Sequence, residues 1–285
     1  VVALESTVVA HGLPWPANLE TARAAEEAVR ASGAVPATIA VVRGKLHVGL
    51  AASELERLAT SGAFEKASRR DLSTCVASRR DAATTVSATL WIARTCGIAV
   101  MATGGIGGVH RDAASTWDVS ADLDELARAD SCLVVCSGVK SILDMPATLE
   151  ALETRGVAVV GYQTDTLPAF TVSSSGLPVE AQVDSPTRAA AIVRAHRALG
   201  LPGAVLLTQP VPPAHAIAPV EMQAALGQAL AEAERQAVRG KAITPFLLDR
   251  IRQTTGGRSL QANIALIVAN AGLAGAVAVE LAHDV

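Results

Sequence analysis

Short apolar runs that alternate with helical segments are the feature that most limits what this chain can fold into. Because that alternation is typical of βα units, it predicts an α/β fold with a mostly parallel sheet covered by helices on both faces. We expect the C-terminal helices to pack on the same domain, so that residues 1–285 form a single domain. The apolar runs expected to be buried strands are Val1–Leu4, Ile98–Met101, Leu133–Val135, Val157–Tyr162 and Ala204–Leu207.

The composition indicates which residues build the core and which class of partner to expect. Half of the residues are apolar, but the aromatic residues are only three Trp, one Tyr and three Phe. The core must therefore be built from Ala, Val, Leu and Ile, which favours tight packing of helices on a sheet. The net charge is -3 and no basic run is present, so a nucleic acid polymer is not the expected partner. A small phosphorylated molecule needs only a few well-placed Lys or Arg side chains.

Cysteine spacing and hydropathy favour the cytoplasm. The four cysteines form no CxxC pair, which indicates buried thiols in a reducing compartment. No charged stretch precedes an apolar run at the start of the chain, so no signal peptide is visible. The run from Asn263 to Ala282 is apolar enough to suggest a membrane span. Its Asn, Glu and Gly residues favour a buried helix instead, and no membrane partner is expected.

Three local patterns predict secondary structure near the polar residues. The cationic segment Lys66–Leu72 is expected to be a solvated loop, the usual structure of such runs; a phosphate or carboxylate clamp is the alternative. Residues 81–85 are expected to lead directly into a helix ending near Thr95. The sequence Ser137-Gly138-Val139-Lys140 is expected to turn directly into a helix that ends near Thr154.

Two candidate chemical groups follow predicted strands. Ligands of α/β sheets bind at the carboxyl ends of the strands, and Glu5 comes directly after the first strand. On position alone, Glu5 is as well explained by a structural acid as by a catalytic one. Lys140 follows a buried strand and Gly138. Partial desolvation there favours the neutral amine that Schiff-base chemistry needs, although most lysines simply point to solvent.

A glycine-rich turn and an acidic cluster lie between these two positions. Residues 103–108 read Thr-Gly-Gly-Ile-Gly-Gly after a strand, where backbone N–H groups can approach a phosphate. The pattern is neither GxGxxG nor a P-loop, and a structural turn would use Gly as readily. Ser120 is a candidate helix N-cap with Asp122, Asp124 and Glu125 in the first turn. Asp118 precedes that cap, and its carboxylate is a ligand type that Mg²⁺ or Mn²⁺ prefers.

Taken in chain order, these segments resemble pseudouridine-5'-phosphate glycosidases, the indigoidine-synthase-A-like family. The resemblance covers nearly the whole chain. The residues that carry it are Leu4-Glu5-Ser6-Thr7, His11-Gly12-Leu13-Pro14, Lys66, Ser68-Arg69-Arg70-Asp71-Leu72, Thr103-Gly104-Gly105-Ile106-Gly107-Gly108-Val109-His110-Arg111, Asp118-Val119-Ser120-Ala121-Asp122-Leu123, Gly138-Val139-Lys140-Ser141-Ile142-Leu143-Asp144, Thr244-Pro245-Phe246-Leu247-Leu248, Ser259-Leu260 and Asn263-Ile264-Ala265-Leu266.

The resemblance implies reversible cleavage of the C–C glycosidic bond of pseudouridine 5'-phosphate to uracil and ribose 5-phosphate. It also implies a homotrimer that uses Mn²⁺, with Mg²⁺ as a substitute. By residue, it implies that Lys140 is the nucleophile that forms a Schiff base at C1' of the opened ribose, and that Glu5 is the proton donor. It implies Asp118 as the metal ligand. The implied substrate contacts are Lys66, Val86, Thr103, His110, Ser120, Ala121, Asp122 and Asn263.

Three positions depart from the family pattern. Asp112 follows His110-Arg111 where Gly is common, Gln209 precedes Pro210 where Asn is usual, and Ala269 replaces one Asn of a frequent Asn-Asn pair. We expect these changes to affect recognition of the base or the loops, because Lys140 and Glu5 are intact.

Two other functions share some of these residues. One is a Schiff-base lyase or aldolase that acts on another sugar phosphate and keeps Lys140 and Glu5. The other is a non-catalytic protein that binds a phosphorylated metabolite. The family chemistry is coherent with the residues, since a C–C glycosidic bond has no heteroatom to protonate and the two-carboxylate plan of ordinary glycosidases does not apply. A lysine nitrogen at C1' makes cleavage feasible through an iminium.

Overall fold

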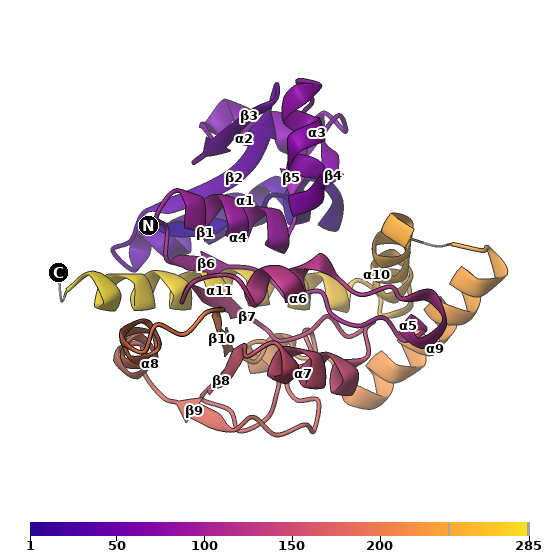
Figure 1. Cartoon of the computed structure of the whole chain (residues 1–285). Coiled ribbons are helices and arrows are strands. Elements are labelled where there is room, and N and C mark those ends of the chain that lie inside the picture. The colour runs from indigo at the N-terminus through magenta and orange to yellow at the C-terminus, as the bar shows by residue number, and fades with distance from the viewer. Residues whose placement is uncertain (239, 284–285) are drawn as a thin grey trace.

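A single mixed sheet forms the centre of the computed structural model, which describes residues 1–238 and 240–283 (Figure 1). The strands follow the order β4-β5-β2-β1-β6-β7-β10-β8-β9, and β3 pairs with β2 beside this path. Their bounds are β1 Val2–Leu4, β2 Pro36–Val42, β3 Lys45–Val48, β4 Glu65–Ala67, β5 Ala82–Thr84, β6 Val100–Ala102, β7 Leu133–Cys136, β8 Ala158–Tyr162, β9 Ala181–Val183 and β10 Val205–Thr208.

Parallel pairing brings several strand ends to one level, as the sequence predicted. Strands β2, β1, β6, β7, β10, β8 and β9 pair in parallel in that order. In this register Leu4 lies opposite Ala102, and Ala102 lies opposite Val135. The residues that follow β1, β6 and β7 therefore emerge side by side at the carboxyl edge of the sheet. The antiparallel pairs of the described strands are those of β2 with β3 and with β5.

Helices cover both faces of the sheet. On one face α11 packs against β1, β6 and β7 and also contacts α1 and α8; Figure 1 shows it behind the strands, with α4 and α6 in front. The α-helices are α1 Ala17–Ala31, α2 Ala52–Thr60, α3 Leu72–Ala77, α4 Val86–Thr95, α5 Ala113–Thr116, α6 Ala121–Leu126, α7 Met145–Thr154, α8 Pro186–Ala198, α9 Pro219–Arg235, α10 Ile243–Thr254 and α11 Arg258–Ala282. Shorter turns are the π-helical η1 Val8–Gly12 and the 3₁₀ turns η2 Arg69–Asp71, η3 Pro213–His215 and η4 Gly240–Ala242.

The core is aliphatic, as the composition predicted. Among the described residues, the largest side chains that are fully buried are Leu, Ile and one Met, with no aromatic ring. Helix α11 is the described helix that is long and apolar enough to cross a membrane, and half of that apolar window is buried inside the protein. Its packing along the sheet explains this hydrophobicity as that of a core helix.

Three local predictions were wrong. Lys66 belongs to strand β4 rather than to a solvated loop, and residues 82–84 form β5 rather than the lead into a helix. The cause is tertiary pairing of β4 with β5, which overrides the local pattern of these short segments. The helix after Lys140 begins only at Met145, because the Asp144 side chain caps it by accepting a hydrogen bond from the Ala147 N–H at 3.0 Å.

Candidate active site

The carboxyl ends of β1, β6 and β7 border a cavity of about 360 Å³. Ten of the residues singled out in the sequence line it, and the structure thus brings together segments separated by up to 258 positions, from Glu5 to Asn263. They are Glu5, Lys66, Val86, His110, Asp118, Ser120, Ala121, Asp122, Lys140 and Asn263. Thr103 does not line this cavity, but its hydroxyl donates a hydrogen bond to the Glu5 carboxylate.

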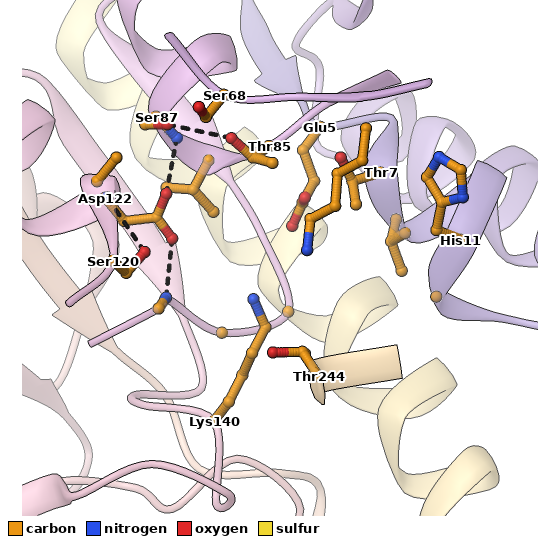
Figure 2. A pocket seen from close by; sticks show the side chains of 18 of the residues that line it. Glu5, Thr7, His11, Ser68, Thr85, Ser87, Ser120, Asp122, Lys140 and Thr244 are labelled. Carbon is orange, nitrogen blue, oxygen red and sulfur yellow. Dashed lines mark hydrogen bonds between the residues drawn. The ribbon is translucent and has the colours of Figure 1, made fainter. Parts of the chain in front are cut away.

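Glu5 and Lys140 extend into the same space from different strands. Glu5 follows β1, and Lys140 lies on the loop after β7; Figure 2 shows the lysine side chain pointing toward the part of the cavity where Glu5 lies. Burial raises the pKa of Glu5 above its ordinary value, although Lys140 and the Thr103 hydroxyl oppose the shift. A carboxyl group with a raised pKa holds its proton closer to neutral pH, which suits a group that gives and then retakes a proton.

A glycine sets the turn that presents Lys140. Gly138 has φ +74, and a Cβ at this position would lie 2.0 Å from the Pro168 carbonyl oxygen. Only glycine fits there, because it tolerates both the left-handed backbone and the close approach. The Ile106 N–H donates to the Gly138 carbonyl at 3.0 Å, and the Lys140 N–H donates to the Ile106 carbonyl at 3.3 Å. The lysine loop and the glycine-rich loop therefore hold each other.

The glycine-rich loop is shaped by the protein itself. Its Gly107 N–H donates to Asp122 Oδ2 at 2.8 Å, and its Val109 N–H donates to Thr148 Oγ1 at 2.9 Å. On the other side, the fully buried Asn270 of α11 donates to the Thr103 carbonyl at 2.9 Å. Several of the loop's backbone groups thus have protein partners, and its conformation needs no anion to explain it.

Asp122 links two walls of the cavity. Its side chain is buried, with 6% exposure, and Oδ1 accepts from the Ser87 N–H at 3.0 Å while Oδ2 accepts from the Gly107 N–H. Ser120 caps α6 as predicted, its hydroxyl accepting from the Asp122 N–H at 3.2 Å. A Cβ on Gly107 would lie 2.3 Å from Ser120 Oγ. The predicted substrate contact Asp122 therefore also joins the glycine-rich loop to the start of α4.

Strands β4 and β5 deliver Lys66 and Val86 to the cavity by a route that the sequence did not reveal. Strand β2 extends past the end of β1, and β5 runs back along this extension toward Glu5. Ser6 secures the junction, because its backbone N–H donates to the Thr84 carbonyl at 3.3 Å and its hydroxyl accepts from the Thr84 N–H at 2.8 Å. Strand β4 pairs with β5, with Lys66 opposite Ala83.

Asp118, the predicted metal ligand, lies beside His110, a predicted substrate contact. The Asp118 side chain is 43% exposed, and its Oδ2 lies 3.9 Å from His110 Nδ1. The backbone N–H of His110 donates a hydrogen bond to the Asp118 carbonyl oxygen at 3.1 Å. In the described part of the chain, no group of three or more His, Cys, Asp or Glu side chains could enclose a metal ion. These residues therefore fit a hydrated Mg²⁺- or Mn²⁺-type ion that takes one protein carboxylate and completes its shell from water and substrate. They do not fit an ion held by protein ligands alone.

Asn263 supplies an open hydrogen-bond acceptor. Within the described residues its Oδ1 is buried and has no hydrogen-bond partner, and the residue also lines a neighbouring cavity of about 350 Å³. A buried amide oxygen without a partner is costly. A ligand N–H or O–H that reaches it from the cavity would remove that cost.

Several cavity residues were not among the predicted site residues, although some of them stand in the segments that carry the family resemblance. Figure 2 labels six of them, which come from η1, the η2 turn, the start of α4 and α10: Thr7, His11, Ser68, Thr85, Ser87 and Thr244. Burial and the neighbouring Lys66 lower the pKa of His11, which favours the neutral imidazole. Recognition of β5 would have pointed to Thr85 and Ser87, since both follow the end of that strand. Thr244 opens a segment that carries the family resemblance, but no local pattern gave it a role in the site.

Comparison with known proteins assigns the family. The model of the family described as indigoidine synthase A like protein matches residues 1–280. The chain belongs to this family. Relatives within the indigoidine synthase A-like family include the protein named pseudouridine-5'-phosphate glycosidase of Herpetosiphon aurantiacus, which is 55% identical over 285 residues that cover 100% of this chain and 94% of the relative. The protein of the same name from Geobacillus kaustophilus is 52% identical over 281 residues, covering 99% and 93%.

Two solved structures agree with the fold. The prealnumycin C-glycosynthase AlnA, solved in complex with ribulose 5-phosphate, superposes with a TM-score of 0.90 at 40% identity, covering 99% of this chain and 91% of AlnA. An indigoidine synthase A-like protein of Thermotoga maritima superposes with a TM-score of 0.91 at 38% identity, covering 98% and 92%. The predicted α/β architecture is therefore confirmed at the level of the family.

Proposed function

We propose that this protein is a pseudouridine-5'-phosphate glycosidase, an enzyme that reversibly cleaves the C–C glycosidic bond of pseudouridine 5'-phosphate to uracil and ribose 5-phosphate. The observation that carries the proposal is the placement of Lys140 and Glu5 on one cavity, after strands β7 and β1, which lie on either side of β6. Relatives that bear this name share half or more of the sequence over almost the whole chain.

The chemistry follows from these two side chains. Glu5 gives its proton to the ring oxygen as the bond from that oxygen to C1' breaks, and the Lys140 amine forms a bond to C1'. The Glu5 carboxylate then takes a proton from the lysine nitrogen. The lone pair of that nitrogen forms the C1' iminium while the bond to uracil breaks, and C5 of uracil takes the proton from Glu5. Water hydrolyses the iminium, which releases ribose 5-phosphate and frees Lys140.

The 5'-phosphate belongs at the cationic end of the cavity in this proposal. Lys66, Ser68 and Arg70 line that end, together with Val86 and Ser87 in the first turn of α4. Lysine and arginine donors and the start of a helix favour a phosphate group. The Oδ1 of Asn263, which has no hydrogen-bond partner among the described residues, is then available to an N–H of the uracil ring.

A divalent cation, Mn²⁺ or in its place Mg²⁺, is part of the proposal. Asp118 would hold it, with His110 beside the carboxylate. When bound, such an ion would supply positive charge that orients water, base or phosphate. The protein's own contribution there is a half-exposed carboxylate that faces the cavity.

The homotrimer and the cytoplasmic location are proposals that rest on the family resemblance. Three of the four cysteines are buried, which supports a reducing compartment. Burial raises the pKa of the Cys136 thiol to about 12, so that it stays protonated and serves packing rather than chemistry.

Release of uracil from pseudouridine 5'-phosphate tests the proposal. The wild-type protein should release uracil and form ribose 5-phosphate, and Lys140→Ala should abolish turnover while keeping the fold. AlnA, which is named a prealnumycin C-glycosynthase and was solved with ribulose 5-phosphate, has the same fold. Absence of uracil release by the wild-type protein, together with cleavage of another C-glycosyl sugar phosphate, would favour that second function.

A further inference from the structure

Helix α6 carries a second buried carboxylate three residues after Asp122. Glu125 is 1% exposed, and its Oε2 accepts a hydrogen bond from Arg69 Nη1 at 2.9 Å. Among the described residues its Oε1 has no hydrogen-bond partner, and the nearest cation on that side is Arg94 Nη2 at 3.9 Å. Glu125 does not line the cavity, so its burial needs a reason outside direct contact with a ligand.

Arg69 explains where this carboxylate acts. It is the first residue of the η2 turn, between Ser68 and Arg70, which both line the cavity. Its backbone N–H approaches Ser87 Oγ at 3.4 Å. The pair of Arg69 with Glu125 thus ties the η2 turn, from the side, to the helix that already holds the glycine-rich loop through Asp122.

Energetics favour a geometric role for this pair. A buried carboxylate carries a desolvation penalty that its partner repays only in part, so such a pair is weak evidence for stability. The role best supported for buried ionic groups is to fix one arrangement among several. Here the fixed arrangement is the approach of the η2 turn to the start of α4, which is the end of the cavity assigned to the phosphate.

We infer that Glu125 is a positioning residue that, through Arg69, holds the η2 turn in the conformation that binds the phosphate group of the substrate. The inference rests on the proposed function for the identity of the substrate, but the phosphate contact can be measured separately. It adds to the site a residue that touches neither the substrate nor the reacting atoms.

Substitution Glu125→Gln tests the inference, because it keeps the shape and removes the charge. The kcat/KM ratio of pseudouridine 5'-phosphate to pseudouridine measures how well the phosphate is recognised. We expect this ratio to fall about ten-fold or more, the size of one charge-assisted hydrogen bond, with the change in KM rather than in kcat. The variant Arg69→Gln should show the same loss, and the double variant should lose no more than either single one.

Arg94→Gln is the matched control. Arg94 also faces Glu125 and pairs with Asp130, but it does not line the cavity. This variant should leave the ratio unchanged even where it lowers the free energy of unfolding. An equal fall of the ratio in Arg94→Gln, or an unchanged ratio in Glu125→Gln, would overturn the inference.

Equilibrium binding of inorganic phosphate separates this inference from the proposed function. Glu125→Gln should weaken phosphate binding at least as much as it lowers the ratio. If the wild-type protein binds phosphate but releases no uracil, the proposed function fails while the binding comparison still decides the role of Glu125. Equal phosphate binding by the wild type and Glu125→Gln would overturn the inference, even where the wild type releases uracil.

Discussion

Asp122 offers the sharpest test of how the cavity is built. Its two carboxylate oxygens accept hydrogen bonds from two backbone N–H groups, those of Ser87 at 3.0 Å and Gly107 at 2.8 Å. Asp122→Asn keeps the shape but replaces one acceptor with an NH₂ group that must face a backbone N–H. One buried hydrogen bond to a charged group is lost and one buried donor is left unsatisfied. From these two contributions we expect a loss of about 3 kcal/mol in the free energy of unfolding.

Urea unfolding of the ligand-free protein is the assay, with Asp124→Asn as the matched control. Asp124 lies two residues along α6, is 61% exposed and pairs with Arg155 at 3.0 Å. A surface ion pair of this kind contributes about 0–1 kcal/mol, so the control should unfold at nearly the wild-type urea concentration. If Asp122→Asn unfolds where Asp124→Asn does, Asp122 does not join the loop to α4, and its burial has another cause.

Three further outcomes follow from the geometry. Gly107→Ala should lose about 1–3 kcal/mol of stability by urea unfolding, because its Cβ would meet Ser120 Oγ. The control is Gly227→Ala in α9, whose Cβ meets no atom within 4 Å and which should be neutral or gain up to about 1 kcal/mol. Equal urea midpoints for the two variants would contradict the close packing at Gly107. Glu5→Gln should lower turnover by about 10²–10⁴-fold. Because a raised pKa of Glu5 in the folded state makes the stability of the wild type fall as pH rises, the urea midpoint of Glu5→Gln should exceed that of the wild type at pH 8 and match it below the ordinary pKa of 4.5. A gap between the two midpoints that widens toward low pH would mean that folding lowers the pKa of Glu5. A chelator should stop uracil release by the wild type, and added Mn²⁺ should restore it. Asp118→Asn should weaken Mn²⁺ binding measured by calorimetry. Unchanged Mn²⁺ binding by this variant would show that Asp118 does not hold the cation.

The parts of the site that follow buried parallel strands could be predicted from the sequence. Glu5 and Lys140 each come directly after a fully buried run, and parallel strands place their carboxyl ends together. The N-cap role of Ser120 was likewise visible, since its pattern is local. These predictions depend on chain-local signals that tertiary packing did not change.

The rest depends on pairing between distant segments. Strands β4 and β5 are three residues each, which is too short to show a period. The position of β5 follows from the extra length of β2. The acids of α6 were explained by the helix dipole in the sequence, but Asp122 and Glu125 point inward to partners on α4, the glycine-rich loop and η2. A one-dimensional pattern cannot show which face of a six-residue helix meets which neighbour.

Covalent trapping at Lys140 tests the central claim most directly. The wild-type protein is treated with borohydride in the presence of ribose 5-phosphate, and the modified peptide is located by mass spectrometry. The account predicts a stable adduct of one reduced ribose phosphate on Lys140, and no adduct in Lys140→Ala. No adduct in the wild type, or an adduct on Lys66 instead, would contradict the assigned mechanism.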